Sequence, residues 1–303
     1  MTRQAIQPPV KIYRTIVALL VVSTALVSSL PGASSEERKD KTAPEESGTK
    51  TDEQVRREAE QVIRGIDLEI LSDDKWIKVE RIEKPLLFYS DPTRRNDRGS
   101  VWGWGPKGRP VALLELYRGA NNRTQWVFAI CNTSGTKLRA RQADAPWWRE
   151  NDSAAELKDI PGASAPSAEA RLRQRQLKLL AQKFTAHEFW EPDNTRYELR
   201  LLKQPLCTYR DETSGVLDGG LFALANGTNP EILLFVEARV DPKSKSKTVW
   251  QYTVGRLAHA ELHLEYDGKE VFDAPRGNRV AAPNRPYWLS FINAPLDADP
   301  RKP

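Results

Sequence analysis

Four carboxyl groups beside predicted strands are the first residues in this sequence that could do chemistry. They are Asp211, Asp218, Glu231 and Glu237. Two carboxyl groups about 5 to 10 Å apart supply the acid and the base or nucleophile of glycoside hydrolysis. These four residues are therefore the candidate catalytic groups if the protein is a hydrolase.

A second set of polar side chains alternates along residues 257–266. His259, Glu261 and His263 are candidate metal ligands, because imidazole and carboxylate groups bind zinc. On a strand, alternate side chains lie about 6.6 Å apart, which would separate the two histidines by about 13 Å. This is too far for one ion with bonds of about 2.0 to 2.1 Å. A solvated strand face is the competing interpretation, and we predict no metal.

Aromatic and basic clusters are candidate surfaces for a ligand or partner. Trp147 and Trp148 follow Pro146 and could stack on a sugar or dock on a partner protein. A basic stretch near the start of a predicted helix could be a solvated face or could contact an anionic envelope polymer. It contains Arg171, Arg173 and Arg175.

Cys131 and Cys207 are the only cysteines. They could form a disulfide in an exported protein, or they could be two small buried thiols. The sequence contains no phosphate-binding loop, dinucleotide glycine pattern, serine nucleophile elbow or zinc spacing. The absence of these motifs favours a protein that is not an enzyme, and we predict no cofactor.

The N-terminal segment is typical of an export signal. Arg3, Lys11 and Arg14 precede residues 15–30, an uncharged and mostly apolar run. Sixteen residues are fewer than the ~20 of a membrane-spanning helix. We therefore expect a signal peptide at residues 1–35, cleaved before Glu36, with an uncleaved anchor as the alternative. Both place the rest of the chain outside the cytoplasm, in the periplasm or cell envelope.

The net charge argues against a nucleic-acid partner. The formal charge is +5, and loss of the three basic residues of the signal reduces it to +2. A nearly balanced surface gives little steering toward a polyanion. We expect an envelope component or a protein as partner, and membrane contact only through the N-terminal segment.

An internal match at an offset of 120 relates residues 85–118 to residues 205–239. The matched pairs include Tyr89 with Tyr209, Asp91 with Asp211, Gly99 with Gly219, Pro110 with Pro230, and Leu113-Leu114 with Leu233-Leu234. After a longer loop the offset becomes 124, and Trp126 and Phe128 match Trp250 and Tyr252. A self-match of this kind predicts two copies of one structural unit.

The same match weakens the hydrolase hypothesis. Asp218 corresponds to Arg98 and Glu231 to Val111, so the copies do not share an acid pair. The first copy does contain another carboxyl group near these positions, that of Glu115. An Asp that follows a strand often caps a turn through its side chain, which is the competing interpretation of Asp91 and Asp211.

Hydrophobic periodicity predicts an α+β fold with two tandem copies. Each copy would begin with an amphipathic helix, with Val55, Ala59, Val62 and Ile66 on one stripe and Leu177, Leu180, Ala181 and Phe184 on the other. An antiparallel β-meander would follow each helix. Its predicted strands are 76–82, 86–89, 100–104, 111–117, 125–131 and 137–141, then 196–202, 206–210, 220–224, 231–238, 248–254 and 257–266.

Composition marks the boundaries of these units. We expect a charged linker at residues 36–52, the first repeat at 53–146, a linker at 147–169, the second repeat at 170–275 and a proline-rich tail at 276–303. Within this tail only residues 287–292 are apolar enough to dock on a domain.

Residues 199–239 carry a progression that includes Pro205-Leu206, Asp218-Gly219, Leu221-Phe222-Ala223 and Gly227-Thr228-Asn229-Pro230-Glu231. This stretch resembles a group of uncharacterised exported proteins of planctomycete bacteria. The resemblance implies export and carries no activity or site residue with it.

Three functional hypotheses follow from the sequence. The first is a non-catalytic binding or structural module of the periplasm or cell envelope, working through surface contacts. The second is a hydrolase acting on an envelope or extracellular polymer. The third is a small-ligand sensor with its groove between the two repeats.

Overall fold

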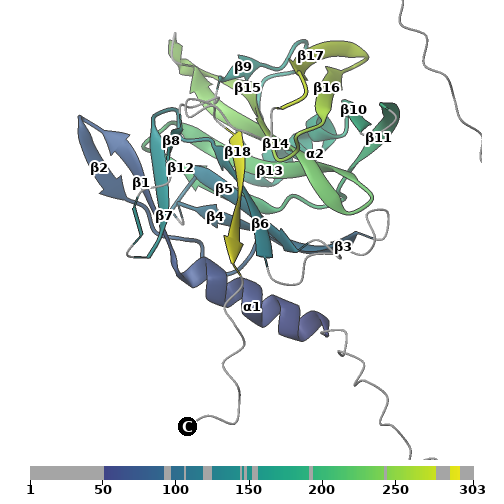
Figure 1. Ribbon diagram of the computed structural model, residues 1–303. Helices are drawn as coiled ribbons and strands as arrows, with labels where there is room; N and C mark the ends of the chain where they lie inside the picture. The colour runs from purple at the N-terminus through teal and green to yellow at the C-terminus, as the bar shows by residue number, and fades with distance from the viewer. Residues whose placement is uncertain are drawn as a thin grey trace, which may run out of the picture. The chain divides into compact units, whose positions relative to one another are not determined.

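The computed structural model describes residues 51–91, 97–105, 107–118, 125–143, 145–146, 149–151, 156–190, 194–241, 244–277 and 287–293, all within one compact unit (Figure 1). The expected signal peptide, nearly all of the charged linker at 36–52, and Trp147 and Trp148 lie outside these residues. No helix in the described ranges has the length and apolarity to cross a membrane.

The predicted α+β class is wrong, because the fold is mostly β. The described residues form two helices and eighteen strands, which assemble into three sheets. The largest sheet has nine strands and curls into an open half-barrel. We call residues 51–151 the first half and residues 156–277 the second half.

The first half contains one helix and two sheets. Helix α1 is Asp52–Arg64, and the four-stranded sheet has the order β2-β1-β7-β8. Its strands are β1 (Ile66–Ser72), β2 (Lys75–Lys78), β7 (Leu138–Gln142) and β8 (Arg149–Asn151). The five-stranded sheet has the order β18-β6-β5-β4-β3, with β3 (Leu87–Asp91), β4 (Asp97–Trp104), β5 (Ala112–Arg118), β6 (Gln125–Asn132) and, from near the C-terminus, β18 (Tyr287–Asn293).

The second half forms the nine-stranded sheet, in the order β17-β16-β10-β11-β13-β14-β15-β9, with β12 also paired to β13. Helix α2 is Ala170–Ala181. The strands are β9 (Lys158–Asp159), β10 (Phe184–Trp190), β11 (Thr195–Leu201), β12 (Cys207–Asp211), β13 (Val216–Asn226), β14 (Asn229–Asp241), β15 (Ser244–Arg256), β16 (Glu261–Tyr266) and β17 (Lys269–Ala274).

The pairing pattern of the first half recurs in the second. β1 pairs with β2 and β7, and β10 pairs with β11 and β16. The run β3-β4-β5-β6 corresponds to β12-β13-β14-β15, and β7-β8 corresponds to β16-β17. The isolated bridge between Arg81 and Trp104 in the first half corresponds to the pairing of Leu201 with Leu224, which joins β11 to β13 in the second half. Corresponding positions of the two halves can therefore be compared strand by strand.

Two errors in the sequence-based prediction account for the wrong class. The last residues of both predicted helix stripes, Ile66 and Phe184, belong to strands β1 and β10, which we did not predict. These strands pair with β7 and β16 rather than with the next strand alone, so neither half is a simple meander. The predicted strand 257–266 also begins later, at Glu261.

Three clusters of buried side chains hold the fold together. One packs α1 on the first half and includes Val62, Trp102 and Trp126, and another packs α2 on the second half around Leu177. The third lies between the halves, where residues such as Leu113 face Leu233 and Phe235. Because this third cluster is apolar, polar groups buried at the same interface need a separate explanation.

Candidate ligand site between the two halves

Each half carries a tyrosine that lies across a glycine of the neighbouring strand. Tyr89 pairs with Gly99, and Tyr209 pairs with Gly219. A Cβ atom on either glycine would overlap the tyrosine ring, so only glycine leaves the necessary space. The two rings are thereby fixed flat against their sheets.

Each of these tyrosines donates a hydrogen bond to a buried glutamate. The Tyr89 hydroxyl lies 2.5 Å from Oε1 of Glu115, and the Tyr209 hydroxyl lies 2.5 Å from Oε1 of Glu237. The two glutamates do not occupy corresponding positions of their strands. Glu237 pairs with Gly219, whereas Glu115 pairs with Val101, two residues beyond the glycine Gly99.

Positions 115 and 117 of β5 correspond to positions 235 and 237 of β14, and both pairs combine one glutamate with one aromatic residue, in reversed order. In the first half Glu115 precedes Tyr117 by two residues, and in the second half Phe235 precedes Glu237 by two residues. Each half therefore presents one carboxyl group and one aromatic ring toward the interface.

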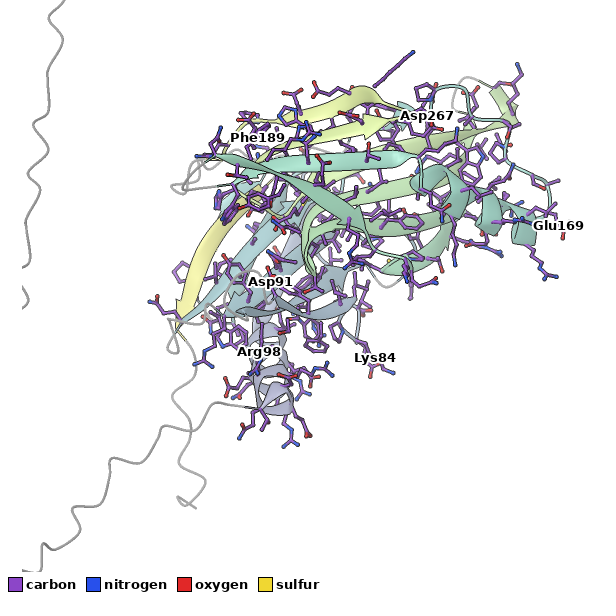
Figure 2. The ribbon with its side chains drawn as sticks, turned by 90° about the vertical axis from the view of Figure 1, so that its right-hand side faces the viewer. Lys84, Asp91, Arg98, Glu169, Phe189 and Asp267 are labelled. Atoms are coloured by element: carbon purple, nitrogen blue, oxygen red, sulfur yellow. The ribbon has the colours of Figure 1, made fainter. Side chains whose placement is uncertain are left out.

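The glutamate of the first half opens into a cavity of about 120 Å³, which we call the interface cavity. It is lined from the first half by Tyr89, Asp91, Glu115 and Tyr117, from the second half by Trp190, Asn229, Glu231, Leu257, Ala258 and His259, and by Tyr287 of β18. Figure 2 shows Asp91 where the strands of the first half meet those of the second. The side chains of Asp91, Glu115 and Glu231 are all buried.

Tyr89 and Tyr287 of the interface cavity keep their protons. Burial raises the pKa of Tyr89 well above its ordinary value, and the nearby carboxylates of Glu115 and Glu231 raise it further. The pKa of Tyr287 is raised in the same way, first by burial and then by Glu115. These phenols therefore act as neutral hydrogen-bond donors beside the carboxyl groups.

The side-chain oxygen of Asn229, in the lining of the interface cavity, is a buried hydrogen-bond acceptor without a donor among the described residues. The residue is 9% exposed, and its Nδ2 donates to Oε1 of Glu231 at 3.0 Å. Its Oδ1 is buried and accepts no hydrogen bond from the described residues. A buried carbonyl oxygen without a donor is costly, so this atom indicates a place for a donor group.

Arg256 holds the connection between β15 and β16 at the rim of the interface cavity. Its Nε donates to the carbonyl oxygen of Ala258 at 2.8 Å, and its Nη2 donates to that of Ala260 at 2.7 Å. The guanidinium also lies 5.5 Å from the ring centroid of Tyr287. The hydroxyl of Tyr287 donates to the carbonyl oxygen of Leu257 at 2.9 Å, which ties β18 to this rim.

The four carboxyl groups that were candidates under the hydrolase hypothesis do not form one site. Asp218 accepts from Arg173, Arg210 and Gln174, and Glu237 binds Arg109 and Arg239. Asp211 accepts from the backbone N–H of Ser214 at 3.2 Å, in the turn after β12. Of the four, only Glu231 lines the interface cavity.

The three candidate metal ligands, for which we predicted no metal, also separate. His263 lies on the exterior of β16, with Nδ1 2.7 Å from Oε2 of Glu270 and Nε2 3.1 Å from Oε1 of Glu261. His259 lies instead in the lining of the interface cavity. In the described part of the chain no group of three His, Cys, Asp or Glu side chains is arranged to bind a metal ion.

The remaining candidates are distributed over the fold. Arg171 and Arg175 are exposed on α2, but Arg173 bonds to buried Asp218 and is therefore not part of a free basic surface. Both cysteines are free thiols rather than a disulfide, Cys131 on β6 and Cys207 on β12. Burial raises the pKa of each thiol to about 12.

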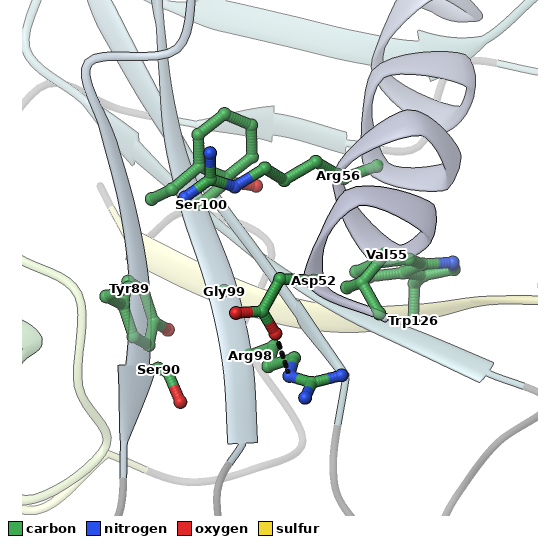
Figure 3. Close-up of a pocket in the computed structure, with 11 residues that line it drawn as sticks. Asp52, Val55, Arg56, Tyr89, Ser90, Arg98, Gly99, Ser100 and Trp126 are labelled. Atoms are coloured by element: carbon green, nitrogen blue, oxygen red, sulfur yellow. Dashed lines mark ion pairs between the residues drawn. The ribbon is translucent and has the colours of Figure 1, made fainter. Parts of the chain in front are cut away.

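A second cavity, of about 100 Å³, lies between α1 and strands β3 and β4 (Figure 3). Its charged groups are engaged with their neighbours: Nε of Arg98 is 2.9 Å from Oδ1 of Asp52, and Arg56 lies over the Phe88 ring at 4.7 Å. Tyr89 lines both cavities and so lies between them. We regard this second space as packing beneath the helix.

Several residues of the interface cavity were not candidates from the sequence. Tyr117, Trp190 and Asn229 come from separate strands, and Tyr287 comes from the proline-rich tail. The available signal was Glu115, a carboxyl group in the middle of the apolar run 112–117. A charged residue in a buried strand generally has a polar reason for being there.

No protein-family model, curated protein or solved structure matches this chain. Its function must therefore be argued from the site.

Proposed function

We propose that this protein is a non-catalytic binding protein, acting in the periplasm or cell envelope, that holds the cationic head group of a small organic ligand in the interface cavity. The observation that carries the proposal is the meeting of three buried carboxyl groups, of Asp91, Glu115 and Glu231, with aromatic side chains from both halves around one space. Carboxyl groups and aromatic faces are the two partners that organic cations prefer in proteins.

The size of the interface cavity favours a head group over a large molecule. A single water needs only about 10 to 15 Å³, whereas pockets for drug-sized ligands are about 300 Å³ or more. A cavity of about 120 Å³ lies between these limits. A cationic group of a few atoms fits this volume, with the rest of the ligand outside.

Binding suits this site better than hydrolysis. Of the four candidate acids of the hydrolase hypothesis only Glu231 lines the interface cavity, so the acid pair of that hypothesis does not meet there. The other proposed acids, Asp218 and Glu237, are held by arginines. A ligand that touches both halves would stabilise the folded protein by mass action.

The test is a thermal-shift and calorimetric titration with four matched compounds that each carry a short straight alkyl chain: n-butylammonium, n-butylguanidinium, butyrate and butanol. We expect at least one cation to bind and raise Tm, and butyrate and butanol to have no effect. Glu115→Gln and Glu231→Gln should each weaken the binding at least about tenfold, since each removes a charged partner.

Glu212→Gln is the matched control. Glu212 is an exposed turn residue, so this change removes the same charge away from the interface cavity and should leave the affinity unchanged. If neither cation binds, or if both cavity variants bind as well as the parent, the proposed function is wrong.

A further inference from the structure

The second half contains a filled counterpart of the interface cavity. Arg109 and Asn229 occupy corresponding positions. Each precedes a proline, and they lie four residues before Leu113 and Leu233 respectively, two leucines that match between the halves. Asn229 reaches into the interface cavity, whereas Arg109 reaches across to the second half. The two residues therefore mark the same place in two related sites.

Arg109 is held by a carboxylate, an aromatic face and a backbone carbonyl. Its Nε lies 2.9 Å from Oε1 of Glu237, its guanidinium lies 4.1 Å from the ring centroid of Phe235, and its Nη1 donates to the carbonyl oxygen of Thr133. The Arg109 side chain is 13% exposed. The protein thus binds a buried guanidinium of its own at this position.

Among the described residues, the interface cavity contains the corresponding groups, with Asn229 at the position of the arginine. Glu115 and Tyr117 supply the carboxyl group and the ring, in reversed order, and Leu257 corresponds to Thr133. The backbone hydrogen bonds support this correspondence. The N–H of Leu257 donates to the carbonyl oxygen of Glu231, and the N–H of Thr133 donates to that of Val111, which is the residue that matches Glu231. Asn229 is shorter than arginine and leaves the space open.

Resting on the proposed function, we infer that the ligand of the interface cavity presents a guanidinium group, which occupies the place that Arg109 fills in the counterpart site. A guanidinium with one alkyl substituent has five N–H donors in one plane, as in arginine. Oδ1 of Asn229 is a buried acceptor without a donor among the described residues, and the carboxyl groups of Glu115 and Glu231, each of which already accepts a hydrogen bond, lie in the same lining. A flat face remains to pack against an aromatic ring, as Arg109 packs on Phe235.

The head group is tested by comparing n-butylguanidinium with n-butylammonium on the intact chain by calorimetry. We expect the guanidinium to bind at least about tenfold more tightly, because its fork makes bidentate contacts that an ammonium cannot make. Equal or tighter binding of the ammonium would overturn the guanidinium inference and leave the proposed function standing. If neither compound binds, the proposed function itself fails.

Asn229→Arg tests the correspondence of the two sites directly. The new arginine should occupy the interface cavity, abolish n-butylguanidinium binding and raise Tm, while Asn229→Ala should keep the cavity open and still bind. Undiminished binding by a folded Asn229→Arg protein would contradict the inference.

Chemical rescue provides the reciprocal measurement if Asn229→Arg does not fold. Arg109→Ala empties the counterpart site and leaves Glu237 with one arginine fewer, so Tm should fall. Millimolar ethylguanidinium should restore part of the lost Tm in Arg109→Ala, whereas ethylammonium should restore less. Equal rescue by both cations would show that the counterpart site does not select a guanidinium, and would overturn the inference.

Discussion

The imidazole rings of His187 and His263 are stacked, with centroids 4.7 Å apart and planes inclined by 6°. The two residues are direct neighbours on β10 and β16. Burial lowers the pKa of His187, and the charges of Arg196 and His263 lower it further. Burial also lowers the pKa of His263, but hydrogen bonds with Glu270 and Glu261 outweigh this effect and hold its pKa above the ordinary value.

These opposite shifts predict opposite contributions to stability as the pH changes. His263 binds its proton more tightly in the folded state, so its stabilisation is complete below the unfolded pKa of about 6.5 and is lost as the pH rises through the folded pKa. His187 binds its proton less tightly in the folded state, so it destabilises the protein as the pH falls below about 6.5.

Urea denaturation at pH 5 and pH 9 checks this prediction. His263→Gln should lower the free energy of unfolding more at pH 5 than at pH 9, by no more than about 1 kcal/mol because Glu261 and Glu270 are well exposed. His187→Phe should show the opposite dependence, with its most favourable change at pH 5. Effects that are equal at both pH values would refute the opposed shifts.

Gly99 and Gly219 should tolerate no larger side chain. A Cβ on Gly219 overlaps the Tyr209 ring, which is tied through its hydroxyl to Glu237 and cannot rotate away without breaking that bond. We expect Gly99→Ala and Gly219→Ala each to lower the free energy of unfolding by about 1 to 3 kcal/mol.

Gly65→Ala is the matched control for these two changes. Gly65 has an ordinary φ of −84°, and its nearest neighbour to a new Cβ would be 3.5 Å away, a normal contact. Its effect in the same denaturation experiment should be small. If Gly219→Ala is as mild as Gly65→Ala, the tyrosine ring is not held as the structure indicates.

Alternation of apolar residues identified most of the strands, because one face of each strand is buried. Residues such as Trp102, Leu114 and Phe128 lie in one core cluster and alternate with residues that face the other way. The same reasoning failed at Ile66 and Phe184. There a helix passes directly into a strand, so an apolar residue fits the end of a helical stripe and the start of a strand equally well.

The interface cavity could not be predicted from the sequence, because it depends on contacts between distant strands. Arg109 and Asn229 are visibly aligned in the internal match, but alignment does not reveal that Arg109 crosses to Glu237, 128 residues away. The carboxyl groups also could not be ranked. Asp218 and Glu231 both lie beside predicted strands, yet Asp218 is surrounded by arginine and glutamine whereas Glu231 lines a cavity.

The two cysteine thiols should be unreactive in the folded protein. The thiolate is the reactive form, and burial raises the pKa of both Cys131 and Cys207 to about 12. At pH 8 we therefore expect no labelling by a disulfide reagent within minutes, and labelling of both thiols in urea. Rapid labelling of a native cysteine would show that its strand opens easily, and Cys207→Ser would identify which one reacts.

Asp218 should be the most important single charge in the packing of α2. Its side chain is fully buried and accepts from Arg173 of α2 at 2.5 Å, from Gln174 at 2.9 Å and from Arg210 of β12 at 3.0 Å. Burial alone would raise its pKa, but these three donors together hold it below the ordinary value. Its stabilisation is therefore present above the unfolded pKa of about 3.9 and is lost as the pH falls through the folded pKa.

Asp218→Asn should consequently lower the free energy of unfolding at pH 7 by about 3 kcal/mol, because it leaves Arg173, 12% exposed, without its carboxylate. The deficit relative to the parent should shrink below pH 4, where the parent loses the same charge. Glu198→Gln is the control: it removes an exposed ion pair with Arg196 of similar length, 2.7 Å, and should change the free energy by less than about 1 kcal/mol. Equal effects of the two substitutions at pH 7 would mean that burial adds nothing to the Asp218 pairs.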